Sequence, residues 1–569
     1  MLSLIVKFVL FLRIRFLEVL GSNVSRNTFV WAAIIGILGG LSTALFREIN
    51  SLFKYILTGQ SIDIVSIAQI LSPEMRLMIP TLGGLLAGLM LLLSSKLFKG
   101  MRSQEYLEVI RLGDGVISIR PTVMKLFSSL LSISSGASVG REGGMVLMSA
   151  LFASSAGRFF NFSKPKLRLL VACGCAAGLA SAYNTPLAGA VFIAEIVMKS
   201  ISIEVLGPLI VSGVFAAITI RHWIGISPIF TLPVFTVPIH TELLPVLGLG
   251  ICCGLISPIL LFLINVSKKI FNYLNLPLPF SLALGGLVVG IISLDMPDVW
   301  GNGHAVIENL LNQSESPNFV WQLLLLKLLA TLIVVGSGTV GGVFTPTLVF
   351  GSTVGWLYSY HLHLLFPSLQ TENVVYAVLG MGALLAGTSH APLMAILMVF
   401  EMTLNGNLLF PLIVVVILTR QISVVMQPKS IYGQISNKTK KNLHYLMQVS
   451  DIQSAVSTMV DMHVTAEKVG QLFCLSSIET IWVIDDNGIY QGAISLQHMK
   501  QFLGDAELKE IIAAWVFMEN TIPTIQAEAA LSDALLMFTQ TEAERLPVVS
   551  KDMRLIGELT KTDVLLTLY

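Results

Sequence analysis

The sequence predicts an all-α polytopic membrane domain followed by a smaller α+β module. First, the 569-residue chain is 54% hydrophobic and only 12% charged, with a mean hydropathy of +0.80, which is too apolar for a soluble protein of this length. Second, the part after about Tyr432 has the charge density of an ordinary soluble sequence, whereas almost everything before it is apolar. Third, each part contains its own internal repeat, which predicts two related membrane halves and a two-copy tail.

Residues 1–28 are predicted to form an amphipathic helix that lies on the membrane surface. The stretch is apolar but carries Lys7, Arg13, Arg15 and Glu18, so it lacks the charged-then-apolar order that marks a cleavable signal. Interleaved charged and apolar residues are typical of a helix in the plane of the interface.

Residues 29–432 contain about a dozen apolar segments, which we expect to form the membrane domain. Examples are 29–46, 76–97, 243–264 and 408–419, and several of the dozen are too short to cross a bilayer as straight helices. Gly and Pro interrupt many of them, and broken backbone at membrane depth is tolerated only where protein or a water-filled cavity satisfies its polar groups. The sequence therefore predicts tilted or re-entrant helices.

An internal repeat relates the two halves of this domain, about 29–235 and 236–432. The shared positions are glycines, serines, a lysine, a proline and a glutamate. At an offset of 202, Gly83, Gly84, Gly88, Lys125, Ser135, Gly136 and Gly140 align with Gly285, Gly286, Gly290, Lys327, Ser337, Gly338 and Gly342; at 206, Pro186 and Glu195 align with Pro392 and Glu401. Repeats of interrupted helices are characteristic of transporters that bind ions near the bilayer midplane, with helix N-termini from both halves pointing at the ion.

The aligned elements at 135–144 and 341–346 each read as a loop that opens a helix. The first is Ser-Gly-Ala-Ser-Val-Gly-Arg-Glu-Gly-Gly, and the second is Gly-Gly-Val-Phe-Thr-Pro. Glycine permits close backbone approach and Pro346 suits a first helical turn, so free N–H groups and the positive end of the helix dipole would face an anion there. Partial charges bind an anion yet allow it to leave, which suits conduction.

Glu142 stands among these backbone donors, inside an apolar region where charge is costly. We interpret it as a proton-sensitive gate. The ionised side chain would occupy the place of the transported anion, and protonation would remove its charge and let it swing away. The alternative is a structural ion pair with adjacent Arg141, although neighbouring residues on a helix do not face each other.

These motifs resemble those of the CLC chloride channel and transporter family, and the resemblance covers essentially the whole chain. Gly140-Arg141-Glu142-Gly143 and Gly342-Val343-Phe344-Thr345-Pro346 are similar to two of the family's three signature elements, and Tyr432 in Ser-Ile-Tyr-Gly is similar to its anion-coordinating tyrosine. The resemblance implies that Glu142 is the external gate and that these two motifs and Tyr432 form the anion site, with chloride held by the amides around Phe344. It also implies inverted repeats and a homodimer with a separate pore in each subunit.

One departure from the family pattern concerns the inner anion ligand. The family's first signature, Gly-Ser-Gly-Ile-Pro, supplies a serine hydroxyl, whereas the corresponding stretch here reads Gly100-Met101-Arg102-Ser103-Gln104. Met101 falls nearest the missing serine, and Ser103 is the candidate substitute. The usual proline after the gating motif is replaced by Gly144. A methionine in this place is similar to the fluoride-exporting branch of the family, so a fluoride exporter is a minor alternative.

A second departure concerns the proton route. Proton-coupled exchangers of the family carry an internal glutamate, whose position here is Ile196. An aliphatic side chain cannot bind a proton, and channels of the family also carry one there, so a passive chloride channel is favoured over a Cl⁻/H⁺ antiporter. Adjacent Glu195 is the remaining proton-pathway candidate. Its alignment with Glu401 indicates a shared structural role for both, such as accepting hydrogen bonds near helix ends.

The second repeat lies in residues 451–569. At an offset of 65, Val483-Ile484, Gly492 and Ile494-Ser495 align with Val548-Val549, Gly557 and Leu559-Thr560, and each copy reads as helix, strand, turn, strand and helix. We predict a linker at 433–450 and copies at 451–504 and 519–569. The pattern resembles a CBS pair, which implies an adenine-nucleotide site between the copies. Thr560 and Asp563 fit the ribose-contacting Ser/Thr-x-x-Asp run of that family, and helix capping explains them equally well.

Composition and motifs also bear on the other classes of function that such a protein could have. A net charge of +1 without a basic run argues against nucleic acid as a partner. The five cysteines lie mostly in apolar stretches without metal-ligand spacing or a disulfide framework, so neither a metal site nor a required cofactor is predicted. Ser389 and His390 lack a triad partner, so an enzyme is not expected. A nucleotide-sensing membrane scaffold is the alternative from another class. We expect a multi-pass protein of a bacterial inner membrane, with a cytoplasmic tail, that carries chloride and similar anions.

Overall fold

The computed structural model divides the chain into two compact units, Met1–Gln434 and Ile435–Tyr569. The division falls next to Tyr432, where the charge density of the sequence changes. The structure describes residues 24–98, 105–111, 113–160, 162–225, 228–232, 239–312, 315–367, 369, 371–433, 448–475, 480–495, 518–519, 522–541, 543–561 and 563–564. Most of the predicted surface helix at 1–28 and of the predicted linker, together with Ser103, lies outside these residues.

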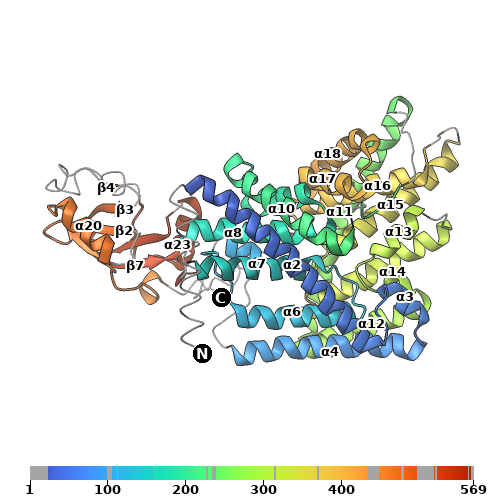
Figure 1. The fold of residues 1–569 in the computed structure, drawn as a ribbon, viewed down its shortest axis with the longest axis horizontal. Helices are drawn as coiled ribbons and strands as arrows, with labels where there is room; N and C mark the ends of the chain where they lie inside the picture. The colour runs from blue at the N-terminus through green and yellow to red at the C-terminus, as the bar shows by residue number, and fades with distance from the viewer. Residues whose placement is uncertain are drawn as a thin grey trace. The chain divides into compact units, whose positions relative to one another are not determined.

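The first unit consists of helices (Figure 1). In the described residues, eight helices are long and apolar enough to cross a membrane, and the segments Pro186–Met198, Asn373–Ser389 and Pro392–Thr403 are apolar but shorter. The chain is therefore a multi-pass membrane protein with interrupted helices, as predicted. In chain order the helices are α2 (Val24–Thr58), α3 (Ile64–Ile70), α4 (Pro73–Leu97), α5 (Tyr106–Arg111), α6 (Ile119–Ser134), α7 (Glu142–Phe159), α8 (Lys164–Tyr183), α9 (Pro186–Phe192), the π-helix η1 (Ile193–Met198), α10 (Ile203–Ile224), α11 (Ile239–Leu274), α12 (Leu278–Asp295), η2 (Pro297–Val299), α13 (His304–Asn312), α14 (Pro317–Gly336), α15 (Phe344–Leu365), α16 (Asn373–Ser389), α17 (Pro392–Thr403), η3 (Gly406–Leu408) and α18 (Leu409–Met426).

Helices α4 and α12, which the repeat aligns, pack against each other in opposite directions. Gly84 lies against Leu282 and Gly88 against Pro279, while Gly286 lies against the carbonyl of Pro80. A β-carbon at any of these glycines would collide with the partner backbone, so glycine is what allows the close approach. Because equivalent spans run antiparallel, the two halves are inverted repeats, as the family resemblance implied.

Equivalent breaks interrupt the helices of both halves. Asn184 ends α8 and His390 ends α16, each with a left-handed backbone, at φ values of 50° and 61°. Pro186 and Pro392 then open the next short helices, where the missing proline N–H costs no helical hydrogen bond. These turns produce the short helices that the sequence predicted.

The second unit contains two small sheets, one for each copy of the tail repeat. Both copies have more strands than predicted: the short strands β1 and β5 precede the helices, and β4 adds a fourth strand to the first sheet. The elements are η4 (Val449–Asp451), β1 (Met459–Asp461), α20 (Ala466–Leu475), β2 (Thr480–Ile484), β3 (Tyr490–Ser495) and β4 (Met518–Glu519) in the first copy, and β5 (Ile525–Gln526), α23 (Leu531–Gln540), β6 (Arg545–Val549) and β7 (Leu555–Thr560) in the second.

The two sheets have the same register at the predicted offset of 65. Val460 pairs with Val483 in parallel β1 and β2, just as Ile525 pairs with Val548 in β5 and β6. The β2–β3 and β6–β7 ladders both shift register, after Val483 and after Val548. The β-turns of the copies also pair reciprocally: Tyr490 N–H donates to Met553 O at 3.0 Å and Leu555 N–H donates to Gly488 O at 3.1 Å. The two sheets thus share one register at the offset of the tail repeat.

Candidate functional site

The starts of α7 and α15 meet at Gly140 and Gly342. The Gly140 N–H donates to Gly342 O at 2.7 Å, and the Gly342 N–H donates to Gly140 O at 2.9 Å. A β-carbon at either residue would collide with the carboxyl group of Glu142, so both positions need glycine. This pairing brings the two aligned motifs, which the sequence places 202 residues apart, into one site.

Glu142 is the first residue of α7, and its carboxylate lies at the start of α15. The Phe344 N–H donates to Glu142 Oε1 at 3.1 Å, and the Thr345 hydroxyl donates to Glu142 Oε2 at 3.2 Å. Only 5% of Glu142 is exposed. A free amide at a helix N-terminus carries partial positive charge, so the site favours a negative group. We call the backbone around Gly140, Gly342 and Phe344, with the Thr345 hydroxyl, the anion seat.

Arg141 does not neutralise this carboxylate. Among the described residues no ion pair joins Arg141 to Glu142, and Arg141 stands at the N-cap position of α7. Gly143 follows within the first turn, where a β-carbon would lie 3.7 Å from Gly342 N. Val343 is the N-cap of α15, and Pro346 belongs to its first turn. The structural ion pair considered from the sequence is therefore absent from this part of the chain.

Tyr183 extends the seat by one more hydroxyl group. It is the last residue of α8, it is 4% exposed, and its oxygen lies 2.6 Å from Thr345 Oγ1. Its ring packs against Phe344, with 5.3 Å between the ring centroids. Sequence analysis missed Tyr183 because it belongs to neither motif, and nothing local marks a tyrosine at a helix end as part of a distant site.

Tyr432 reaches the same region through aromatic contacts. Its ring meets Phe192 edge-on at 5.4 Å between centroids, and Phe192 in turn contacts Phe344 at 6.4 Å. The Ile431 N–H donates to Thr388 O at 3.0 Å and anchors this segment against α16. Ser103, the predicted inner ligand, lies outside the described residues.

The proton-pathway candidates have different surroundings. Glu195 Oε2 accepts the Met394 N–H at 3.0 Å, and reciprocally Glu401 accepts the Leu187 and Ala188 N–H groups at 3.1 and 2.8 Å. Each glutamate thus caps the short helix of the other half, as the repeat alignment predicted. Ile196 is buried, and the Arg111 guanidinium donates to its carbonyl and to that of Val197.

In the tail, Thr560 and Asp563 bond to each other. Thr560 Oγ1 lies 2.6 Å from Asp563 Oδ2 and accepts the Asp563 N–H at 3.0 Å, which is the geometry of a helix cap after β7. Nearby, Glu558 is buried and accepts hydrogen bonds from Trp482 Nε1, Ser457 Oγ and Arg545 Nη1, at 2.9, 2.9 and 3.0 Å. This network, which the sequence did not reveal, links the two copies.

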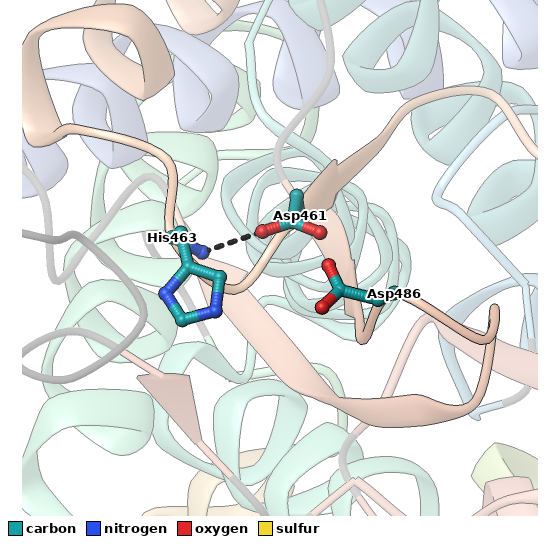
Figure 2. A group of neighbouring side chains, drawn as sticks. All are labelled: Asp461, His463 and Asp486. Atoms are coloured by element: carbon teal, nitrogen blue, oxygen red, sulfur yellow. Dashed lines mark hydrogen bonds between the residues drawn. The ribbon is translucent and has the colours of Figure 1, made fainter.

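Asp461, His463 and Asp486 are the described residues that could hold a metal ion, with ligand atoms within 4.8 Å of one another. Figure 2 shows them gathered at one edge of the sheet, because the parallel strands β1 and β2 end side by side. All three side chains are exposed, and Asp461 Oδ1 already accepts the His463 N–H at 2.8 Å. An exposed group of this kind would need water to complete an ion's coordination, and we assign no metal to it.

Comparison with known proteins agrees with this architecture. Residues 83–424 match the family described as voltage gated chloride channel, and residues 509–569 match the CBS domain. A ClcB-like chloride channel protein of Ralstonia nicotianae is 45% identical over 389 residues, which cover 67% of this chain and 90% of that protein.

Solved structures share the fold. The crystal structure of a slow cyanobacterial Cl⁻/H⁺ antiporter matches with a TM-score of 0.63 and 29% identity, covering 72% of this chain and 97% of the antiporter. That of a eukaryotic CLC transporter matches with a TM-score of 0.65 and covers 94% of this chain and 97% of its own. At 18% identity the second match shows likeness of fold alone.

Proposed function

This chain belongs to the voltage gated chloride channel family, and from that membership we propose that it carries chloride along a pathway gated by Glu142. The observation that carries the proposal is the Glu142 carboxylate in the anion seat, where it accepts the Phe344 N–H and the Thr345 hydroxyl. A carboxylate oxygen and a halide compete for the same donors. Chloride can therefore enter the seat only when the side chain has left it.

Protonation is the step that frees the seat. A neutral carboxyl group loses most of its attraction to the amide and to the positive end of the α15 dipole, so it gains little by staying. Chloride then receives the same N–H and O–H donors, which bind it by partial charges and release it again. Flux through the pathway should rise as the external pH falls.

Passive conduction is the favoured mode. Ile196 offers no proton-binding group at the internal position, and the Arg111 guanidinium at its carbonyl places a positive charge where a proton carrier would need to sit. The second candidate is Cl⁻/H⁺ antiport, which the 29% identity to a cyanobacterial antiporter supports. In that case Glu195, which is bonded to Met394, is the first residue to test as the proton carrier.

The deciding experiment measures the reversal potential of the purified full-length protein in liposomes under opposed chloride and proton gradients. A potential that follows the chloride Nernst value alone supports the channel. A potential that moves with the proton gradient supports the antiporter, and Glu195→Gln should then abolish the proton dependence. Fluoride flux faster than chloride flux would favour the exporter alternative, and no anion flux at all would favour the scaffold.

We further propose that the tail is cytoplasmic, that it binds an adenine nucleotide near Thr560 and Asp563, and that the protein is a homodimer in a bacterial inner membrane. The existing Thr560–Asp563 pair leaves the cap intact without a ligand, so binding must compete with it. Titration calorimetry of the full chain with ATP and AMP tests the site, with Thr560→Ala expected to abolish any heat. Equal heats in both proteins would assign Thr560 to capping alone.

A further inference from the structure

Two hydroxyl groups, those of Tyr183 and Thr345, form a series of hydrogen bonds that ends at the Glu142 carboxylate. Thr345 has a single hydroxyl proton, and an ionised carboxylate can only accept, so that proton is used in the bond to Glu142 Oε2. The oxygen of Thr345 must then accept from its other neighbour, which is the Tyr183 hydroxyl at 2.6 Å. Tyr183 is therefore the donor, and both hydroxyl dipoles point toward the anion seat.

We propose that Tyr183 is a positioning residue for the anion seat: through Thr345 it sets how firmly the seat holds either the gating carboxylate or a chloride ion. The inference rests on the proposed gating by Glu142. The hydrogen bond that the structure gives to Tyr183 at the anion seat is the one to Thr345. It holds the Thr345 proton in the direction of the seat and strengthens it, because a hydroxyl that accepts a hydrogen bond is a better donor.

The residues around Tyr183 keep the two hydroxyl groups in one orientation. Tyr183, Thr345 and Glu142 are 4%, 1% and 5% exposed, so water does not compete for the donors. The Tyr183 ring is fixed against Phe344, whose own N–H is the second donor of the seat. Donors that are oriented before the ion arrives cost no reorganisation when it binds, which is the condition for strong stabilisation of charge in a dry site.

Protonation of Glu142 removes the reason for this orientation. A neutral carboxyl group accepts the Thr345 hydroxyl proton more weakly than the ionised group does, so the Thr345 and Tyr183 dipoles stabilise it less. The two hydroxyl groups thus favour the ionised carboxylate over the neutral one. Glu142 therefore stays in the anion seat until the proton concentration is high enough to protonate it. Once the side chain has left, the same two dipoles favour chloride.

The test uses Tyr183→Phe, which removes the hydroxyl and keeps the ring on Phe344. In liposomes, we expect the midpoint of flux against pH to move toward higher pH by about half a unit to one unit, equal to a change of about 3- to 10-fold in proton concentration. The matched control is Tyr358→Phe, whose hydroxyl donates to Pro245 O at 2.8 Å in another part of the same unit. It should leave the midpoint where it is in the parent.

Action through Thr345 is tested with a double-mutant cycle. Thr345→Val removes the second hydroxyl at nearly constant shape, and adding Tyr183→Phe to it should shift the midpoint no further. Thr345→Ser retains the hydroxyl and should resemble the parent. If the Tyr183→Phe protein does not survive purification, Thr345→Val and Thr345→Ser are compared instead, because only Thr345→Val removes the hydroxyl that joins Tyr183 to Glu142. Equal midpoints of flux against pH in these two variants would overturn the proposal.

Chloride binding separates this inference from the gating proposal. In a Glu142→Gln background no carboxylate competes, and Tyr183→Phe should weaken chloride binding by about 3- to 10-fold in titration calorimetry. A Glu142→Gln protein that still responds to pH would refute the gate, whereas the calorimetric comparison would still test Tyr183. Unchanged chloride affinity, or a shift that simply adds to that of Thr345→Val, would refute the role of Tyr183.

Discussion

Gly140 and Gly342 exchange both of their backbone hydrogen bonds, at 2.7 and 2.9 Å, and this reciprocal pair joins the two halves of the membrane domain. Equivalent residues that bond to each other in this way must lie beside a two-fold axis. The capping of Met394 by Glu195, and of Ala188 by Glu401, obeys the same symmetry. Glu142 breaks it, because its counterpart is Phe344, and one carboxylate therefore fills a place made by both halves.

Glu142→Gln should leave a conducting protein with little pH dependence. The amide cannot ionise, so it has no charge to compete with chloride for the Phe344 N–H, and acid has nothing left to protonate at the gate. Chloride efflux from liposomes, measured across a pH series, checks this result. A variant that titrates like the parent protein would show that another group controls the flux.

Gly342→Ala should also remove most of the pH dependence, by a steric route. The added methyl group would collide with the Glu142 carboxyl group, so the side chain could no longer rest in the seat. Gly143→Ala is the matched control, because its methyl group would meet no atom closer than 3.7 Å. The same efflux series compares the two, and equal pH profiles in both variants would argue against the steric explanation.

Tyr432→Ala should weaken chloride binding by about tenfold or more, the order of one hydrogen bond to an ion. The loss would include the edge contact with Phe192, which connects Tyr432 to Phe344. Tyr432→Phe keeps that contact and removes the hydroxyl alone. Calorimetry with chloride on both variants assigns the effect to the hydroxyl or to the ring, and unchanged affinity in both would exclude Tyr432 from the site.

Glu558→Ala should destabilise the tail by about 3 kcal/mol, because it leaves the Arg545 guanidinium and the Trp482 N–H without their buried acceptor. Glu528→Ala is the control: Glu528 pairs with Lys551 at 2.9 Å on the surface and should contribute about 0.5 kcal/mol or less. Scanning calorimetry of the full-length protein measures both. Equal unfolding temperatures for the two variants would contradict a structural role of the buried network.

Part of this architecture could be predicted from the sequence because its causes are local or periodic. Apolar runs of membrane length, the offsets of 202 and 65, and glycine-rich helix starts are all visible along the chain. The carboxylate of Glu142 among backbone donors is equally local, since charge within an apolar segment requires a partner or a function. The alignment of Glu195 with Glu401 indicated a shared role near helix ends, and the structure supplied the N–H groups that they accept.

The tertiary structure decided which of these elements meet. Tyr183 comes from α8 and Thr345 from α15, and their bond depends on how these helices pack. The Glu558 network and the group of Asp461, His463 and Asp486 also join residues that are distant in sequence. The pattern of residues in a helix or strand specifies which of its faces is apolar. The partner of a buried polar group, in contrast, depends on how elements that are distant in sequence pack against each other. For that reason the sequence by itself determined the two halves and indicated Glu142 as the candidate gate, whereas only the folded chain revealed the hydroxyl groups near its carboxylate.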